Sequence, residues 1–220
     1  VPLLPLLLFF LLSLPMLFFF TYAQVAALSF ARLGLSPAGA FLLFALSLLG
    51  SGINLPLRRQ QVPVDPPLVP PITFFWLFPM VQPPRVAERV LAVNVGGAVI
   101  PTLFSLYLLG AGRAPWLPVL IATLLVAAIA KALARPLPGR GIVLPAFIPP
   151  LAAAVIALLV APPGSRAPVA YIAGTLGTLV GADLLNLKAL DRMGPGMLSI
   201  GGAGVFDGIF LVGVLAAFLA

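Results

Sequence analysis

Long apolar runs separated by short polar connections dominate the pattern of this chain. A membrane-spanning helix needs about 20 mostly apolar residues, and most of the runs approach or reach this length. We predict about seven spanning helices, over residues 1–30, 37–55, 90–109, 115–134, 151–160, 168–187 and 205–219. The expected fold class is an all-α polytopic membrane protein, with residues 1–220 forming a single transmembrane domain. The first run lacks the basic start of a secretory signal and is too long for one, so a retained helix is expected.

Two proline-rich stretches interrupt this helical pattern. Residues 56–89 form the least membrane-like part of the chain, and within them the β-branched and aromatic residues 72–78 predict a short interfacial strand or hairpin after the second helix. Residues 141–150 contain three prolines. Because proline and the residue before it both resist helix formation, this stretch is expected to be extended.

The composition supports a membrane location. Hydrophobic residues make up 62% of the chain and charged residues only 8%, whereas a soluble domain has about 45–50% and about 25%. Such a chain cannot cover a globular surface with polar groups, but lipid solvates apolar faces without that covering. The lipid bilayer is therefore the expected partner, and the cell membrane the expected location.

The distribution of basic residues predicts an orientation. Nine of the twelve lie in the connections after the second, fourth and sixth predicted helices: Arg58, Arg59, Arg85, Arg89, Lys131, Arg135, Arg140, Lys188 and Arg192. The other connections hold only Arg32, Arg113 and Arg166. By the positive-inside rule the N-terminus is cytoplasmic and the C-terminus is outside. The formal charge of +7 does not indicate nucleic-acid binding, because the basic residues form no cluster.

The chain has no cysteine and no histidine. This excludes disulfides, thiol nucleophiles, Ser–His triads and most zinc or haem sites. We therefore expect no metal and no cofactor, and the chemistry must come from five acidic residues, the basic residues, hydroxyls and amides.

Two aspartates stand in apolar surroundings and are the candidate catalytic residues. Asp183 lies near the end of the sixth predicted helix, and Asp207 near the start of the seventh. Ionisable groups at membrane depth are costly and usually functional. Because consecutive antiparallel helices are commonly neighbours, the two carboxylates are expected to face each other at similar depth. Two carboxylates in one low-dielectric site can share a proton and activate water, although either alone can also serve a structural role.

Six further residues are candidates for substrate binding. Gly202 and Gly204 allow close backbone approach, and Pro145 with Ala146 can present irregular backbone to an extended substrate. Asn54 and Asn94 lie at predicted cytoplasmic helix ends. For each group an ordinary structural role, in helix packing, chain termination or capping, is the competing interpretation.

Residues 52–57, 93–107, 145–151, 171–187 and 197–211 carry a resemblance to a known family. In these stretches the chain resembles an uncharacterised multi-pass membrane family, the domain-of-unknown-function family sixteen-fourteen. The resemblance covers most of the chain after the first helix. It implies a multi-pass protein of a prokaryotic inner or plasma membrane, and it names no activity.

A looser resemblance is to the presenilin and signal-peptide-peptidase group of intramembrane aspartyl proteases. Ala182-Asp183 is similar to the Tyr-Asp motif of that group, with alanine for tyrosine. The segment from Gly202 to Asp207 is similar to its Gly-x-Gly-Asp motif, with two extra residues. Pro145-Ala146-Phe147 is similar to its Pro-Ala-Leu element, but it precedes the aspartates instead of following them.

Two functional hypotheses follow. The first is an intramembrane aspartyl-type peptidase, in which Asp183 and Asp207 activate water against a transmembrane peptide substrate. The alternative is a proton- or cation-coupled transporter that uses the same carboxylates as an ion site. A non-catalytic membrane scaffold is a third possibility.

Overall fold

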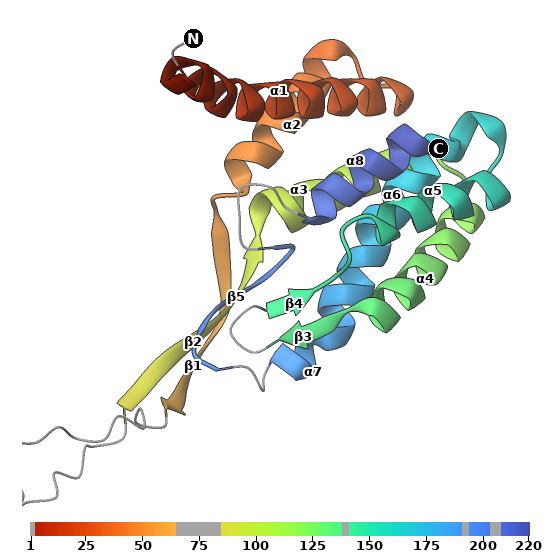
Figure 1. Cartoon of the computed structure of the whole chain (residues 1–220). Helices are drawn as coiled ribbons and strands as arrows, with labels where there is room; N and C mark the ends of the chain where they lie inside the picture. Colours follow the sequence, from red (N-terminus) through yellow and green to blue (C-terminus); the bar gives the residue numbers. More distant parts are fainter. Residues whose placement is uncertain (1–2, 65–84, 138–140, 191–193, 203–207) are drawn as a thin grey trace, which may run out of the picture.

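The computed structural model describes residues 3–64, 85–137, 141–190, 194–202 and 208–220 (Figure 1). Its helices are α1 (Leu3–Arg32), α2 (Pro37–Gly50), α3 (Ile100–Gly110), α4 (Trp116–Leu133), α5 (Ile148–Val160), α6 (Arg166–Thr178), α7 (Leu187–Leu190) and α8 (Gly208–Leu219). Four single-turn segments join them: the π-helical η1 (Val95–Val99) and η3 (Leu179–Asp183), and the 3₁₀-helical η2 (Pro163–Ser165) and η4 (Leu184–Asn186). The strands are β1 (Asn54–Val64), β2 (Arg85–Asn94), β3 (Arg135–Leu137), β4 (Gly141–Val143) and β5 (Gly196–Ile200).

Three helical stretches are long and apolar enough to cross a membrane, namely Leu7–Arg32, Trp116–Leu133 and Pro163–Ala189. Four shorter apolar helices accompany them, at Pro37–Gly50, Val95–Gly110, Ile148–Val160 and Ile209–Leu219. The mostly helical prediction is confirmed, but seven full-length spans are not. At 1.5 Å per residue the shorter helices fall below the roughly 30 Å of a hydrocarbon core.

Helix α6 is the centre of the bundle. It packs against α4, α5 and α8, as the parallel ribbons in Figure 1 show, and all but one of its residues from Pro168 to Thr178 are buried. Glycines make this packing possible because they let helix backbones approach closely. A side chain at Gly177 would meet Val126 of α4, and one at Gly213 of α8 would overlap the hydroxyl of Thr175.

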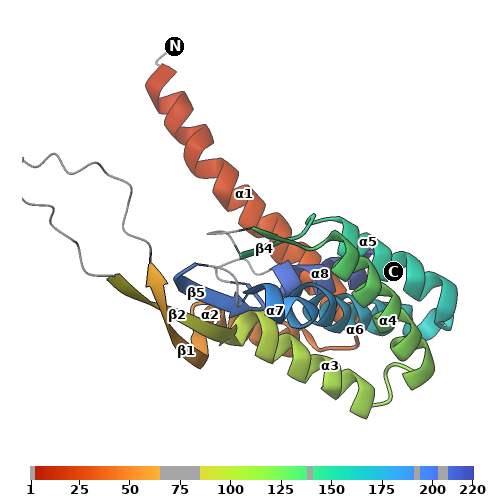
Figure 2. The same cartoon turned by 90° about the horizontal axis from the view of Figure 1, so that it is seen from below.

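Helix α1 is only partly attached to the bundle. Its C-terminal end is fixed to α8, because Ser29 Oγ donates to the carbonyl of Val214 at 2.9 Å and Arg32 Nη1 to that of Phe218 at 2.6 Å. Figure 2 shows the N-terminal half projecting beyond the other helices. That half carries a run of exposed leucine and phenylalanine side chains, the surface expected for contact with lipid.

A three-stranded sheet corrects the all-α prediction. Its strand order is β1-β2-β5, with β1 antiparallel and β5 parallel to β2, and the β1–β2 hairpin extends away from the helices (Figure 1). The third predicted helix is wrong at its start, because residues 90–94 belong to β2. The valines of β2 suit a strand, and every residue of Arg85–Asn94 except Arg85 and Val86 has its register partner between Asn54 and Val62.

The boundaries of α2 and α5 lie closer to those predicted from the sequence. Ser36 caps α2 as expected, accepting the amide of Gly39 at 3.2 Å, although α2 ends at Gly50 and not near residue 55. The stretch 141–150 forms a strand only at Gly141–Val143, and after a turn at Ala146 and Phe147 helix α5 begins at Ile148 with prolines in its first turn, where a missing amide hydrogen costs little. The interfacial strand expected at 72–78 lies outside the described residues.

The junction between sheet and bundle depends on one glycine. Gly96 of η1 lies against the end of α2 so closely that a β-carbon would overlap the carbonyl oxygen of Ser47 and the amide nitrogen of Ser51. These are backbone atoms of a helix and its cap, so they cannot turn away as a flexible side chain would. No other residue type fits this crossing without moving α2.

We expect Gly96→Ala to destabilise the protein by roughly 2 kcal/mol or more, the range for overpacking a close contact. The matched control is Gly110→Ala at the end of α3, where a β-carbon meets no atom within 4 Å. Thermal unfolding in detergent measures both variants. Equal melting temperatures for the two would contradict the crossing described here.

Candidate functional site

A cavity of about 230 Å³ lies between the end of α6 with η3, the segment that joins β4 to α5, the residues that follow β5, and the start of α8. Its lining residues are Ile142, Leu144, Pro145, Ala146, Pro149, Thr178, Ala182, Asp183, Gly202, Ile209, Leu211 and Val212. Four of the eight candidate residues, Asp183, Pro145, Ala146 and Gly202, therefore line one cavity. The lining is mostly apolar, with Asp183 and Thr178 supplying its polar side chains.

Asp183 is held in place by the backbone that follows β5. Its Oδ2 accepts the amide hydrogen of Gly201 at 2.7 Å, and the side chain is partly buried. Gly201 has a φ of +87°, and a β-carbon there would lie 2.5 Å from the β-carbon of Ala98. Glycine is thus required both by conformation and by space. The sheet, the η1 turn and the carboxylate meet at this residue.

The helix that carries Asp183 changes its winding just before the cavity. Helix α6 continues as the π-turn η3, which ends at Asp183, and then as the 3₁₀-turn η4. Gly181 in η3 lies against α4, where a β-carbon would overlap the carbonyl oxygen of Ala127. Gly177 and Gly181 therefore form a pair of small residues four apart that brings α4 and α6 together, as in other membrane helix pairs.

A cation and an amide bind three carbonyl groups of this irregular segment, and neither role was predicted from the sequence. Asn186 Nδ2 donates to the carbonyls of Ala182 at 2.8 Å and Gly181 at 3.3 Å. Lys131 Nζ, from the last turn of α4, donates to the carbonyl of Leu185 at 2.8 Å and to Asn186 Oδ1 at 2.6 Å. The available signal was an amide three residues after an aspartate at a helix end, which is weak by itself.

Thr178 is the second polar residue of the cavity and was also missed. Its side chain is 3% exposed, and within the described part of the chain its hydroxyl has no hydrogen-bond partner. Buried hydroxyls are normally paired. An unpaired one facing a cavity is available to a water molecule or to a bound ligand.

Asn94 and Asn54 occupy a different place. Asn94 is fully buried and caps η1, accepting the amide of Gly97 at 2.7 Å and donating to the carbonyl of Ser51 at 2.7 Å. It also donates to Asn54 Oδ1 at 3.2 Å, and that oxygen accepts the hydroxyl of Ser199 at 2.6 Å. This network joins β1, β2 and β5, and neither asparagine lines the cavity.

Asp207 and Gly204 lie outside the described residues. In sequence they fall between Gly202 and Ile209, which both line the cavity. Among the described residues there is no group of three or more histidine, cysteine, aspartate or glutamate side chains that could hold a metal ion.

The chain is a membrane protein by its apolar composition and by its three helices of spanning length. Comparison with family models then identifies the family: residues 48–219 match the model described as a protein of unknown function, DUF1614. The match covers most of the chain, which therefore belongs to this uncharacterised family, as its sequence resemblance indicated. No curated protein and no solved structure matches the chain, so these comparisons do not support the looser resemblance to intramembrane aspartyl proteases.

We expect Asn186→Leu to destabilise the helix end, because it leaves the carbonyls of Gly181 and Ala182 without their buried donor. Each unsatisfied carbonyl costs about 1–3 kcal/mol, so the melting temperature in detergent should fall clearly. Lys188→Met, two residues further on, is the control, since no hydrogen bond or ion pair involves that lysine in the described residues. A fall as large in the control would show that the network contributes little.

Proposed function

We propose that the protein is an intramembrane aspartyl-type peptidase in which Asp183 and Asp207 form the water-activating pair. The observation that carries this proposal is the cavity that both the Asp183 carboxylate and the irregular segment Leu144-Pro145-Ala146 line. A peptidase of this type needs a carboxylate, room for water and a surface for unwound substrate in one place. The cavity contains the carboxylate of Asp183, and its volume and irregular backbone suit water and an unwound substrate.

The proposed chemistry divides two roles between the carboxylates. One, ionised, takes a proton from water as the oxygen attacks the peptide carbonyl. The other, protonated, donates a hydrogen bond to that carbonyl and stabilises the developing charge. Collapse of the tetrahedral intermediate breaks the C–N bond, and the leaving amine receives a proton from the pair. The Thr178 hydroxyl, unpaired and lining the same cavity, is suited to orient the water.

The proposed substrate is a transmembrane peptide unwound at the cleavage point. Strand β4 pairs with β3 along one edge, and Ile142 in β4 and the following Leu144 line the cavity. A substrate strand added at a sheet edge gains main-chain hydrogen bonds without sequence specificity. Gly202, which also lines the cavity, is proposed to leave space for substrate backbone, and Gly204 remains a candidate for the same role.

A coupled transporter is the alternative, and the broken helix next to Asp183 is the observation that favours it, because transporters place ion sites at such breaks. The carbonyls of Gly181, Ala182 and Leu185 would be natural cation ligands there. They are instead bound by Asn186 and Lys131. The peptidase is therefore the better-supported proposal.

Purified protein in detergent or liposomes should cleave a reporter transmembrane segment, and Asp183→Asn should abolish cleavage, with a loss of at least about a thousandfold for removal of a water-activating carboxylate. Asp207→Asn should do the same. Glu88→Gln is the matched control, because this glutamate is half exposed and forms an ion pair with Arg59 on the hairpin, away from the cavity. Activity that survives Asp183→Asn would refute the proposal, and proton-dependent uptake without cleavage would favour the transporter.

We further propose that the chain crosses the cell membrane several times with its N-terminus in the cytoplasm. The connections rich in basic residues lie at the end of the bundle that carries β3, β4, α7 and the sheet, and the loop between α1 and α2 lies at the other end (Figure 1). Lys131, Arg135 and Lys188 belong to the first end. Arg113, which touches Gly34 in the α1–α2 connection, belongs to the second.

Because the chain has no cysteine, single substitutions can test this orientation. In intact cells a membrane-impermeant maleimide should label Ala111→Cys, in the connection before α4, and should label Leu137→Cys only after permeabilisation. Both positions are exposed and uncharged, so neither change alters the charge that sets topology. The reverse labelling pattern would invert the proposed orientation.

A further inference from the structure

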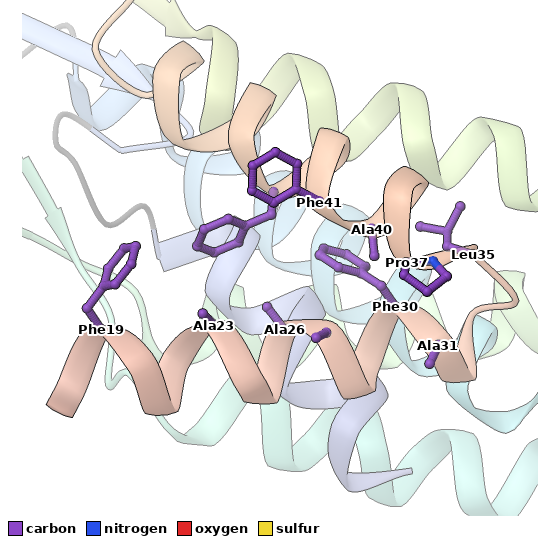
Figure 3. A pocket seen from close by; sticks show the side chains of 11 residues that line it. Phe19, Ala23, Ala26, Phe30, Ala31, Leu35, Pro37, Ala40 and Phe41 are labelled. Atoms are coloured by element: carbon purple, nitrogen blue, oxygen red, sulfur yellow. The ribbon is translucent and has the colours of Figure 1, made fainter. Parts of the chain in front are cut away.

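A second cavity, of about 340 Å³, lies between α1 and α2 and is separate from the proposed catalytic site. Figure 3 shows its lining: alanines of α1 form the floor, aromatic rings close its sides, and Leu35 of the connection and Pro37 at the start of α2 close one end. The lining residues are Phe19, Ala23, Ala26, Ala27, Phe30, Ala31, Leu35, Pro37, Ala40, Phe41 and Phe44. No lining side chain is polar.

The cavity exists because small side chains of α1 form one of its walls. Ala23, Ala27 and Ala31 repeat every four residues along α1, and Ala40 of α2 also lines the cavity, so these positions leave the space between the helices unfilled. The cavity is not sealed, since Phe41 at its rim is 73% exposed. Its volume lies in the range of small-molecule sites, about 300–1,000 Å³, and only an apolar ligand matches the lining.

A free cation stands at the closed end. The guanidinium of Arg113, from the α3–α4 connection, lies beside Gly34, where a β-carbon would be 2.6 Å from Nη1. Gly34 precedes Leu35, which lines the cavity. Arg113 is exposed, and within the described residues its guanidinium makes no hydrogen bond or ion pair. Arg32, at the end of α1, is instead engaged with Phe218 of α8.

This end of the cavity coincides with a membrane surface. One spanning-length helix ends at Arg32 and another begins at Trp116, which is 71% exposed, as expected of an aromatic anchor at the headgroup level. Arg113 therefore stands at the depth of lipid phosphates, and the apolar cavity begins directly below it at the depth of acyl chains. A phosphate and a hydrocarbon chain joined in one molecule match both features.

We propose that the groove between α1 and α2 is a binding site for an anionic phospholipid, with one acyl chain in the cavity and the phosphate on Arg113. Guanidinium is the group best suited to phosphate, because its planar donors bind two oxygens at once. The acyl chain fills the space that the alanines of the lining leave between the helices. This inference does not depend on the proposed peptidase function.

Native mass spectrometry of delipidated protein titrated with phosphatidylglycerol tests the site. Wild type should retain one lipid per chain, and Arg113→Gln should weaken binding by roughly tenfold, the worth of a hydrogen-bonded charge. Ala27→Leu should weaken it independently by filling the mouth of the groove, at a partly lipid-facing position where a larger side chain does not disturb the core. Arg135→Gln, which removes an exposed cation at the other end of the bundle, should bind like wild type.

Two further ligands test the phosphate contact and the acyl-chain contact separately. Diacylglycerol, which has the chains without the phosphate, should bind more weakly than phosphatidylglycerol, and inorganic phosphate should not displace the lipid. Binding that is unchanged in both Arg113→Gln and Ala27→Leu would overturn the proposal. So would equal weakening by Arg135→Gln, because the effect would then be one of overall charge.

Discussion

The requirement that every backbone polar group be satisfied inside the bilayer governs this structure more than any other constraint. Helix α6 loses its regular winding at η3, and in lipid each carbonyl released there would cost several kcal/mol. Asn186 binds the carbonyls of Gly181 and Ala182, and Lys131 binds that of Leu185 from the neighbouring helix. Gly177 and Gly181 bring α4 close enough for the lysine to reach. These local donors stabilise the irregular segment.

The proposed site depends on these hydrogen bonds to the irregular segment. An α-helix that continued past Thr178 would keep its own carbonyls bonded and would present its side chains with the usual period. The π-turn instead ends at Asp183, whose carboxylate accepts the amide of Gly201. The same region contains the unpaired hydroxyl of Thr178 and the irregular segment Leu144-Pro145-Ala146. Polar chemistry is thus gathered at a break in the central helix, surrounded by apolar walls.

The sequence predicted the class of protein and half of the candidate site, and the limits of that prediction have physical causes. The composition and the length of the apolar runs indicated membrane helices, because the thickness of the bilayer sets the number of apolar residues that a spanning helix needs. Asp183 was found because a carboxylate in an apolar run is conspicuous, and Pro145 and Ala146 because proline marks extended backbone. The strand at Val90–Asn94 was missed, since a short apolar run has the same composition in either conformation and its pairing with Asn54 and its neighbours is non-local. Lys131 was taken for a flanking charge, because nothing local reveals that its amine reaches Asn186.

The sheet has a mechanical consequence for the carboxylate in the bundle. Strand β5 runs beside β2 from Gly196 to Ile200, and the next residue, Gly201, holds Asp183. The β1–β2 hairpin, which reaches well outside the helices, is therefore connected to the acidic side chain through a short and continuous path of main-chain hydrogen bonds. A force or a binding event that tilts this arm would reach the carboxylate through β5 and Gly201, and also through η1, which continues β2 into α3. The acid is thereby linked to a surface outside the helical bundle.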